Sequence, residues 1–175
     1  MVQLALDLAL LAVYGGGTAS SATVSGGVTV YQNGKAENTL VSSGGKVTVN
    51  GGGKAVNTTI DNYGSMYLSS GAQADGAIVY YMGQLYVDNG AKLANGTIRF
   101  GKTYISSGGL ANNTVVSHGG LVFVSSGGKM ETAAVSSGGW IHLYYGGFAN
   151  NATVNGYGRF YVSHAASASN VTINS

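Results

Sequence analysis

The sequence predicts an all-β protein, a single-domain parallel β-solenoid in the form of a right-handed β-helix, with about one 19-residue repeat per coil. Three observations predict it: a repeat close to 19 residues long, short alternating runs typical of strands, and Gly-containing turns between these runs. One block is too small to bury a core by itself, so the blocks must stack. We expect parallel strands about 4.8 Å apart between coils, and a right-handed path because crossovers between parallel strands take that hand.

A column of β-branched residues marks the repeat. Val or Ile recurs at the fourth position of successive blocks, 17 to 19 residues apart. The block from Asn95 to Asn112 is one residue short. We expect an N-terminal apolar segment over residues 1–20, which is a cap or an assembly segment, and a solenoid of eight coils with a C-terminal stub over 21–175. The column consists of Val24, Val41, Ile60, Val79, Ile98, Val116, Val135, Val154 and Ile173.

Alternation within each block predicts which side chains face the core. Positions ten and twelve are apolar, as in Val122 and Val124, and position eighteen is mostly small, as in Ala36. With the Val/Ile column, these positions should form a narrow core, although Thr103 interrupts the apolar pattern. Asn recurs at the first position, as in Asn57, and a stacked Asn column hydrogen-bonds from coil to coil.

The composition excludes several classes of function. The chain has 175 residues, with 30 Gly, no Pro and no Cys, so it has neither disulfides nor a thiolate metal site. Eight Lys and Arg against six Asp and Glu give a net charge of +2, which is too weak to hold a nucleic-acid backbone. The acidic residues and the three His fall in separate columns or whole coils apart. We therefore expect no enzyme, no metal and no cofactor.

The N-terminal segment has an apolar face that must be covered. Alternation of Val2, Leu4, Leu6, Leu8 and Leu10 with other residues is typical of a one-sided strand, whereas Leu4, Leu8, Leu11 and Ala12 also fit a short helix. The apolar run is shorter than the roughly 20 residues that span a membrane and contains Asp7, so we expect no membrane insertion. The segment covers either its own first coil or the last coil of a neighbouring subunit.

The C-terminal end is a candidate stacking edge. It consists of residues 170–175, which contain the apolar side chains Val171 and Ile173 and no charged residue. Unpaired strand edges join other chains unless they are capped or charged. Head-to-tail addition of subunits gives an open filament. The alternative is a cap at the N-terminal coil and a bare C-terminal end.

An outward column of aromatic residues is a candidate contact surface. The eleventh position lies between two inward positions and becomes aromatic from the third coil onward. Such an exposed strip fits a sugar or another molecule, and the alternative is that neighbouring rings stack on one another and stabilise the sheet. We define this interaction ladder as Tyr67, Tyr86, Tyr104, Phe123, His142 and Tyr161.

Two blocks carry a specific resemblance. NTTIDNYGSMYLSSGAQAD and NTVVSHGGLVFVSSGGKME resemble the repeats of AIDA-type self-associating autotransporter adhesins, and the likeness extends from about residue 21 to the end of the chain. The resemblance implies a parallel β-helix at a bacterial cell surface or outside the cell, active in aggregation, biofilm and adhesion. It also implies O-glycosylation at repeat serines, which here are Ser43, Ser70, Ser107, Ser126 and Ser137.

Two functions fit these observations. The first is a non-enzymatic extracellular solenoid, structural or adhesive, that associates with itself and stacks head to tail into filaments. The second is an adhesin module that binds a carbohydrate or a cell surface through the interaction ladder. The expected partner is a second copy of the chain, or a surface glycan in the alternative.

Overall fold

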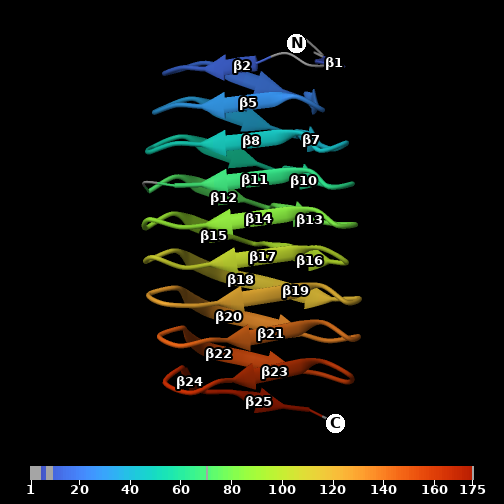
Figure 1. Cartoon of the computed structure of the whole chain (residues 1–175), viewed down its shortest axis with the longest axis vertical. Helices are drawn as coiled ribbons and strands as arrows, with labels where there is room; N and C mark the ends of the chain where they lie inside the picture. Colours follow the sequence, from blue (N-terminus) through green and yellow to red (C-terminus); the bar gives the residue numbers. More distant parts are fainter. Residues whose placement is uncertain (1–4, 7–9, 70, 175) are drawn as a thin grey trace.

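The computed structural model describes residues 5–6, 10–69 and 71–174, which wind into a stack of coils with the N-terminus at one end and the C-terminus at the other (Figure 1). Each coil contributes one four-residue strand to a nine-stranded parallel sheet. Successive strands of this sheet are hydrogen-bonded neighbours, one coil apart. The strands are β2 (Leu10–Val13), β5 (Gly27–Val30), β8 (Lys46–Val49), β11 (Ser65–Leu68), β14 (Gln84–Val87), β17 (Lys102–Ile105), β19 (Leu121–Val124), β21 (Trp140–Leu143) and β23 (Arg159–Val162).

The other two strand segments of each coil form a 16-stranded parallel sheet. Its two arms merge at the long strands β18 (Leu110–Ser117), β20 (Lys129–Val135) and β22 (Phe148–Val154), which run through the corner between the arms. One arm contains β1 (Ala5–Leu6), β4 (Thr23–Val24), β7 (Leu40–Val41), β10 (Thr59–Ile60), β13 (Ile78–Val79), β16 (Thr97–Arg99) and β25 (Thr172–Ile173). The other arm contains β3 (Thr18–Ser20), β6 (Lys35–Glu37), β9 (Lys54–Val56), β12 (Gln73–Asp75), β15 (Lys92–Ala94) and β24 (Ser167–Ser169).

The core confirms the columns that the sequence predicts. Register pairs place like side chains above one another, such as Met66 with Leu85 and Ile60 with Val79. These four side chains are fully buried, as is Ala36 of the eighteenth column. The fold is thus an all-β parallel solenoid with about 19 residues per turn. Within the described ranges, no helix is long and apolar enough to cross a membrane.

The core also contains a column that the sequence did not predict. The second position of most blocks is a buried Thr or Ala, with Thr39, Thr58 and Thr114 at no more than 2% exposure. These side chains lie two residues before the Val/Ile column and are buried with it. The hydroxyls of Thr58 and Thr114 have no hydrogen-bond partner among the described residues, and burying such a group is costly.

The Asn column forms the predicted hydrogen bonds. Asn57 Nδ2 donates to Asn38 Oδ1 at 3.2 Å, and Asn113 Nδ2 donates to Asn95 Oδ1 at 2.6 Å. These residues adopt positive φ near 50°, a left-handed conformation that Asn tolerates better than most residues. Asn therefore turns the corner and bonds to the next coil at the same position.

Glycine is required where a turn crosses closely over the preceding coil. A Cβ on Gly109 would lie 1.9 Å from the backbone oxygen of Val87, so no other residue fits without moving the backbone. The same close approach recurs at the last turn residue of other coils, as at Gly128. The high glycine content follows from this repeated contact.

The N-terminal segment is strand where it is described, and its inward face differs from the prediction. Leu10 pairs with Gly27 and is 80% exposed, whereas Val13 pairs with Val30 and is buried. The register is set by Val13 in the inward column, so Leu10 points to solvent and the expectation that it lies on the covered face was wrong. Leu6 pairs with Val24 through its backbone. Val2, Leu4 and Leu8 lie outside the described residues.

The last coil leaves core positions open. Val162 is 49% exposed and Ile173 is 78% exposed, although their columns are buried in the preceding coils. Phe160 and Val171 are partly buried and pack against the core. The expectation that Phe160 and Val162 lie in the core therefore fails at this end, because a core side chain is closed only when coils lie on both sides of it.

We predict that Thr103→Val stabilises the fold. The Thr103 hydroxyl is fully buried between Leu85 and Val122, and it has no hydrogen-bond partner among the described residues. Replacing it with a methyl group removes an unpaired polar atom and keeps the volume, so the free energy of unfolding should rise by about 1 kcal/mol. Denaturant unfolding measures this. The matched control is Thr48→Val on the outward face of the same sheet, and an unchanged or lowered value for Thr103→Val contradicts the prediction.

Candidate functional site

The interaction ladder lies on the outward face of the nine-stranded sheet. The strands place one ring from each coil directly beside the ring of the next. Tyr67 and Tyr86 stack with ring centroids 4.6 Å apart, Tyr86 and Tyr104 at 4.9 Å, and Tyr104 and Phe123 at 5.3 Å. The interplanar angles of these pairs are 2°, 10° and 23°. The strand spacing therefore holds the rings in van der Waals contact.

The stacking of the rings determines which parts of the interaction ladder are accessible from solvent. Each inner ring has a neighbour on both faces, and Lys46 Nζ lies 4.6 Å from the centroid of the Tyr67 ring. Ring edges and hydroxyl groups are therefore the surface that another molecule meets. Towards the last coils the order breaks down, because Tyr144 stacks on His142 at 4.0 Å and Tyr161 is tilted and 44% exposed.

The ladder also changes the chemistry of its central phenol. Burial raises the pKa of Tyr86 above its ordinary value of 10.0, and the phenols of Tyr67 and Tyr104 raise it further. The Tyr86 hydroxyl donates a hydrogen bond to Gln84 Oε1 at 2.5 Å. The stack thus favours the neutral phenol.

We predict that Tyr86 makes the fold sensitive to alkali. A raised pKa in the folded state means that its stabilising contribution is complete below the unfolded pKa, near 10, and is lost as the pH rises through the folded pKa. Tyr86→Phe keeps the stack and should flatten the loss of unfolding free energy above about pH 10. Denaturant unfolding on both sides of this pH measures the effect. Tyr145→Phe, at an exposed turn, is the control, and equal pH profiles for Tyr86→Phe and the unmodified chain contradict the prediction.

Several acidic and histidine side chains form local hydrogen bonds between coils. Asp75 Oδ1 accepts a hydrogen bond from Asn95 Nδ2 at 2.7 Å, and Asp88 Oδ1 accepts one from Ser106 Oγ at 2.5 Å. His142 Nε2 lies 2.8 Å from Ser163 Oγ. Over residues 5–6, 10–69 and 71–174 no three His, Asp or Glu side chains gather as metal ligands.

The candidate glycosylation serines lie in exposed turns. Ser43 and Ser137 are at the turns that enter the nine-stranded sheet, and Ser107 and Ser126 are at the turns that leave it. Ser43, Ser107 and Ser137 adopt positive φ near 50°, which directs them outward at the corner. Ser70 lies outside the described residues.

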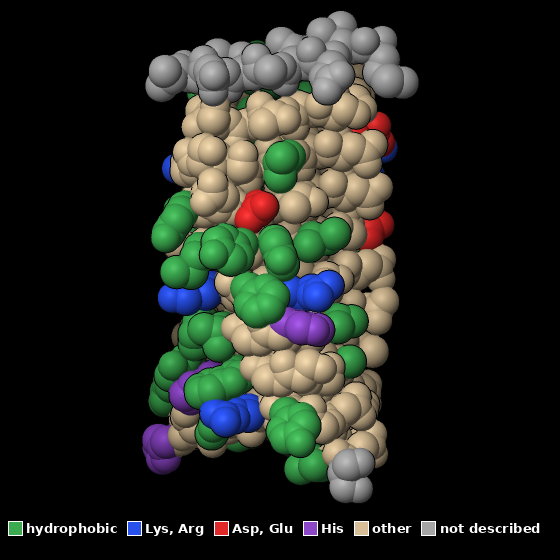
Figure 2. Space-filling view, turned by 90° about the vertical axis from the view of Figure 1, so that its right-hand side faces the viewer, with side chains coloured by type: hydrophobic (Ala, Val, Ile, Leu, Met, Phe, Trp, Pro, Cys, Tyr) green, Lys and Arg blue, Asp and Glu red, His purple; other side chains and the backbone are tan. Residues whose placement is uncertain are grey.

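A second group of exposed apolar side chains was not singled out from the sequence. Tyr63, Tyr81, Met82 and Phe100 lie at successive turns that enter the nine-stranded sheet, and they line a hollow of about 350 Å³ together with Gly119. Figure 2 faces this edge and shows hydrophobic side chains gathered over it. Two signals in the sequence mark it: large residues where other coils have Gly-Gly, and the one-residue deficit of the block from Asn95.

Comparisons with known proteins agree with the class that the fold defines, a β-solenoid of stacked repeats. The family described as adhesin of bacterial autotransporter system, probable stalk (AIDA), matches residues 30–83. A solved structure of a hyper-glycosylated TibA fragment, whose modification TibC catalysed, is similar with a TM-score of 0.63 and 29% identity, over 94% of this chain and 75% of that chain. Curated proteins yielded no match.

The repeats over residues 30–83 are therefore similar to AIDA-type repeats, and the TibA fragment shares the solenoid fold. Together, the matches support an adhesive, autotransporter-type solenoid and favour a non-enzymatic role.

Proposed function

We propose that the chain is an adhesive stalk segment at a bacterial cell surface or outside the cell, and that it associates with copies of itself end to end. The AIDA match and the similarity to the TibA fragment support the adhesive class and the location. End-to-end association rests on one observation, the apolar core side chains that are open at the last described coil.

These open side chains are the continuation of closed columns. Val162 follows Leu143, which is fully buried, and Ile173 follows Val154, which is 6% exposed. Another coil on this end would close them as each coil closes the one before it. Burying apolar surface is worth about 25 cal/mol per Å², so the contact is favourable before its entropic cost is counted.

The strand direction determines which surface fits. All strand pairs in the described residues are parallel, so a coil added at this end must run in the same sense as the coil beneath it. The first coil of a second copy meets that condition, with β2 beside β23 in the nine-stranded sheet. A head-to-tail contact of this kind does not close on itself and grows into a rod.

We predict that the purified 175-residue chain forms rods whose length increases with protein concentration. Negative-stain electron microscopy and light scattering measure this. The double variant Val162→Lys, Ile173→Lys places charge on the open columns and should leave monomers, because a buried unpaired charge is costly. Val115→Lys, an exposed side chain in the middle of the stack, is the matched control. A chain that stays monomeric at millimolar concentration would falsify the proposal.

The interaction ladder remains a second candidate surface. The observation that favours it is the unbroken stack from Tyr67 to Phe123 on one exposed face. Because neighbouring rings cover the ring faces, we propose that a surface glycan meets ring edges and hydroxyls here, and that the main role of the stack is to stabilise the sheet.

We further propose that the turn serines Ser43, Ser107, Ser126 and Ser137 accept sugars. Their exposure supports this, and the similar TibA fragment is hyper-glycosylated. A sugar on these turns lies outside both sheets and leaves the hydrogen bonds between their strands intact. The two edges of the solenoid would then be covered differently, because Ser43 and Ser137 lie on one edge and Ser107 and Ser126 on the other.

A further inference from the structure

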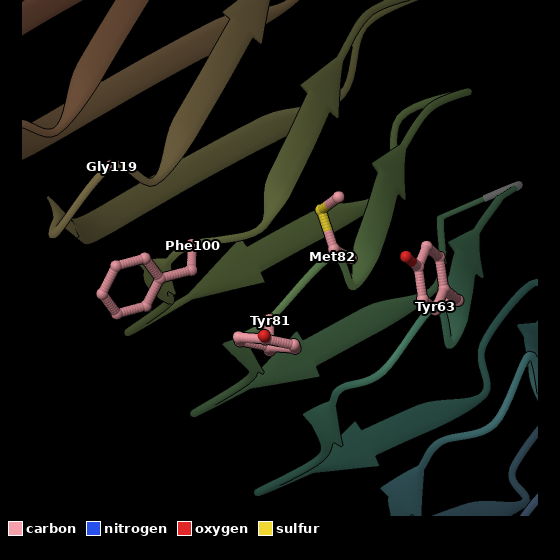
Figure 3. Close-up of a pocket in the computed structure, with 5 residues that line it drawn as sticks. All are labelled: Tyr63, Tyr81, Met82, Phe100 and Gly119. Carbon is pink, nitrogen blue, oxygen red and sulfur yellow. The ribbon is translucent and has the colours of Figure 1, made fainter.

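The hollow on the turn edge, which we call the turn-edge groove, is formed by four successive turns that enter the nine-stranded sheet. Its lining residues are Tyr63, Tyr81, Met82, Phe100 and Gly119, and its volume is about 350 Å³. The close-up in Figure 3 shows Tyr63, then Tyr81 with Met82, then Phe100 at successive turns along one side of the stack, with Gly119 at the turn beyond. The groove lies apart from the interaction ladder and from the ends of the solenoid.

One of the turns that form the groove is short. Arg99 pairs with Ser117 and Lys102 pairs with Leu121, so the strands on both sides of the turn stay in register with those of the next coil. Between these pairs the shorter coil has only Phe100 and Gly101, where the next coil has residues 118–120. A Cβ on Gly101 would lie 2.7 Å from Val79 Cγ1, which shows how closely the short turn lies against the preceding coil.

Two of the lining side chains occupy strained turn positions. Tyr63 has a φ of 65° and Met82 a φ of 68°, and each precedes the tightly packed final glycine of its turn. Gly44, Gly119 and Gly138 occupy this position in other coils, with φ of 74° to 78°. Tyr63 is 63% exposed and Met82 is 49% exposed, so burial does little to offset the strain.

The ring faces in the groove are not covered by a regular stack. Tyr80 is tilted 42° to Tyr81 and lies edge-on to Phe100 at 77°, and Phe100 is tilted 56° to the ring of His118. Tyr81 is 60% exposed and Phe100 is 45% exposed. This arrangement differs from the interaction ladder, where neighbouring rings fill both faces. A flat apolar face of a ligand therefore has rings to pack against here.

Positive charge flanks the groove. Arg99 and Lys102 bracket the short turn, both are exposed, and neither side chain has an ion pair or hydrogen bond in the described part of the chain. Figure 2 shows Lys or Arg side chains on both sides of the hydrophobic group, with a His beside it. Asp61 lies two coils before Arg99 in the same column, and its carboxylate accepts a hydrogen bond from the backbone N–H of Asn62 at 2.6 Å.

We propose that the turn-edge groove binds a carboxylated sugar ring, such as a uronic acid or a sialic acid residue. Its volume is at the lower end of the range for ligand pockets and suits one ring. The C–H face of the sugar packs on Tyr81 or Phe100, and its carboxylate pairs with Arg99 and Lys102. This site does not depend on end-to-end association.

The turns are poorly suited to a peptide. Peptides commonly bind by adding a strand through main-chain hydrogen bonds. Here the turn backbone is already paired between coils, since Met82 N–H donates to the Phe100 carbonyl at 3.0 Å and His118 N–H donates to the Ser137 carbonyl at 2.9 Å. A ligand held by side chains alone fits this edge better than an extended chain.

The test uses the 175-residue chain and saturation-transfer NMR with D-glucuronate and N-acetylneuraminate as probes, D-glucose as the neutral counterpart, and acetate as the free carboxylate. We expect the acidic sugars to bind with millimolar affinity and the other two to bind at least about tenfold more weakly. Arg99→Gln with Lys102→Gln should weaken acidic-sugar binding about tenfold, whereas Lys129→Gln, another exposed lysine, should leave it unchanged.

A second pair of variants separates the site from the fold. Tyr63→Gly and Met82→Gly restore the residue that other coils use at this turn, so they should keep or raise the thermal unfolding temperature while they weaken sugar binding. Tyr157→Gly, at the equivalent turn of a later coil, is the control and should not change binding. The proposal is overturned by equal binding of glucose and glucuronate, by equal binding of acetate, by an unaffected charge variant, or by concentration-dependent shifts showing that a second copy occupies the groove.

Discussion

Parallel stacking at one strand spacing is the constraint on which the rest of this structure depends. Each residue lies beside its counterpart one coil later, as Met66 lies beside Leu85. Equivalent side chains of successive coils therefore repeat along the rod at a spacing of about 4.8 Å. Apolar columns close a core, Asn columns exchange hydrogen bonds, and aromatic columns stack. A residue type that does not tolerate its own kind at this distance must be rare or interrupted.

The distribution of lysines along one column shows this limit on residues that repel their own kind. Lys35 and Lys54 are direct neighbours in one column, and Lys35 forms an ion pair with Glu37. Farther along the same column, Gln73 separates Lys54 from Lys92, and Leu110 separates Lys92 from Lys129. Neutral residues between the lysines reduce the repulsion that adjacent like charges produce. The small number of charged residues in the chain is a consequence of the stack.

Turns are the part of each coil that escapes the constraint. Both irregular blocks lose residues at the same turn edge, between Val24 and Gly27 and between Ile98 and Lys102, and the sheets on either side stay in register. Length and side chains can change there without cost to the core. The solenoid thus separates a repetitive scaffold from one variable edge, which is where loops of other folds also carry function.

This separation explains how much the sequence could predict. The inward columns follow from the repeat and from alternation, because register repeats them in every coil. The orientation of Leu10 was predicted wrongly, because the local alternating pattern does not reveal the register that Val13 sets. The buried Thr column was not predicted, because Thr recurs at the second position in only some of the blocks. The turn-edge groove was missed because Tyr63, Tyr81 and Phe100 come together only once consecutive turns lie beside one another.

The in-register stack can be measured directly as a distance along the rod. The chain has no Cys, so Thr48→Cys with Tyr161→Cys places two spin labels in one outward column. These positions are six coils apart by register. Pulsed electron–electron resonance should give a narrow distribution near 29 Å, about six strand spacings. A distribution displaced by a full coil, or one too broad to define a register, contradicts the stacked solenoid.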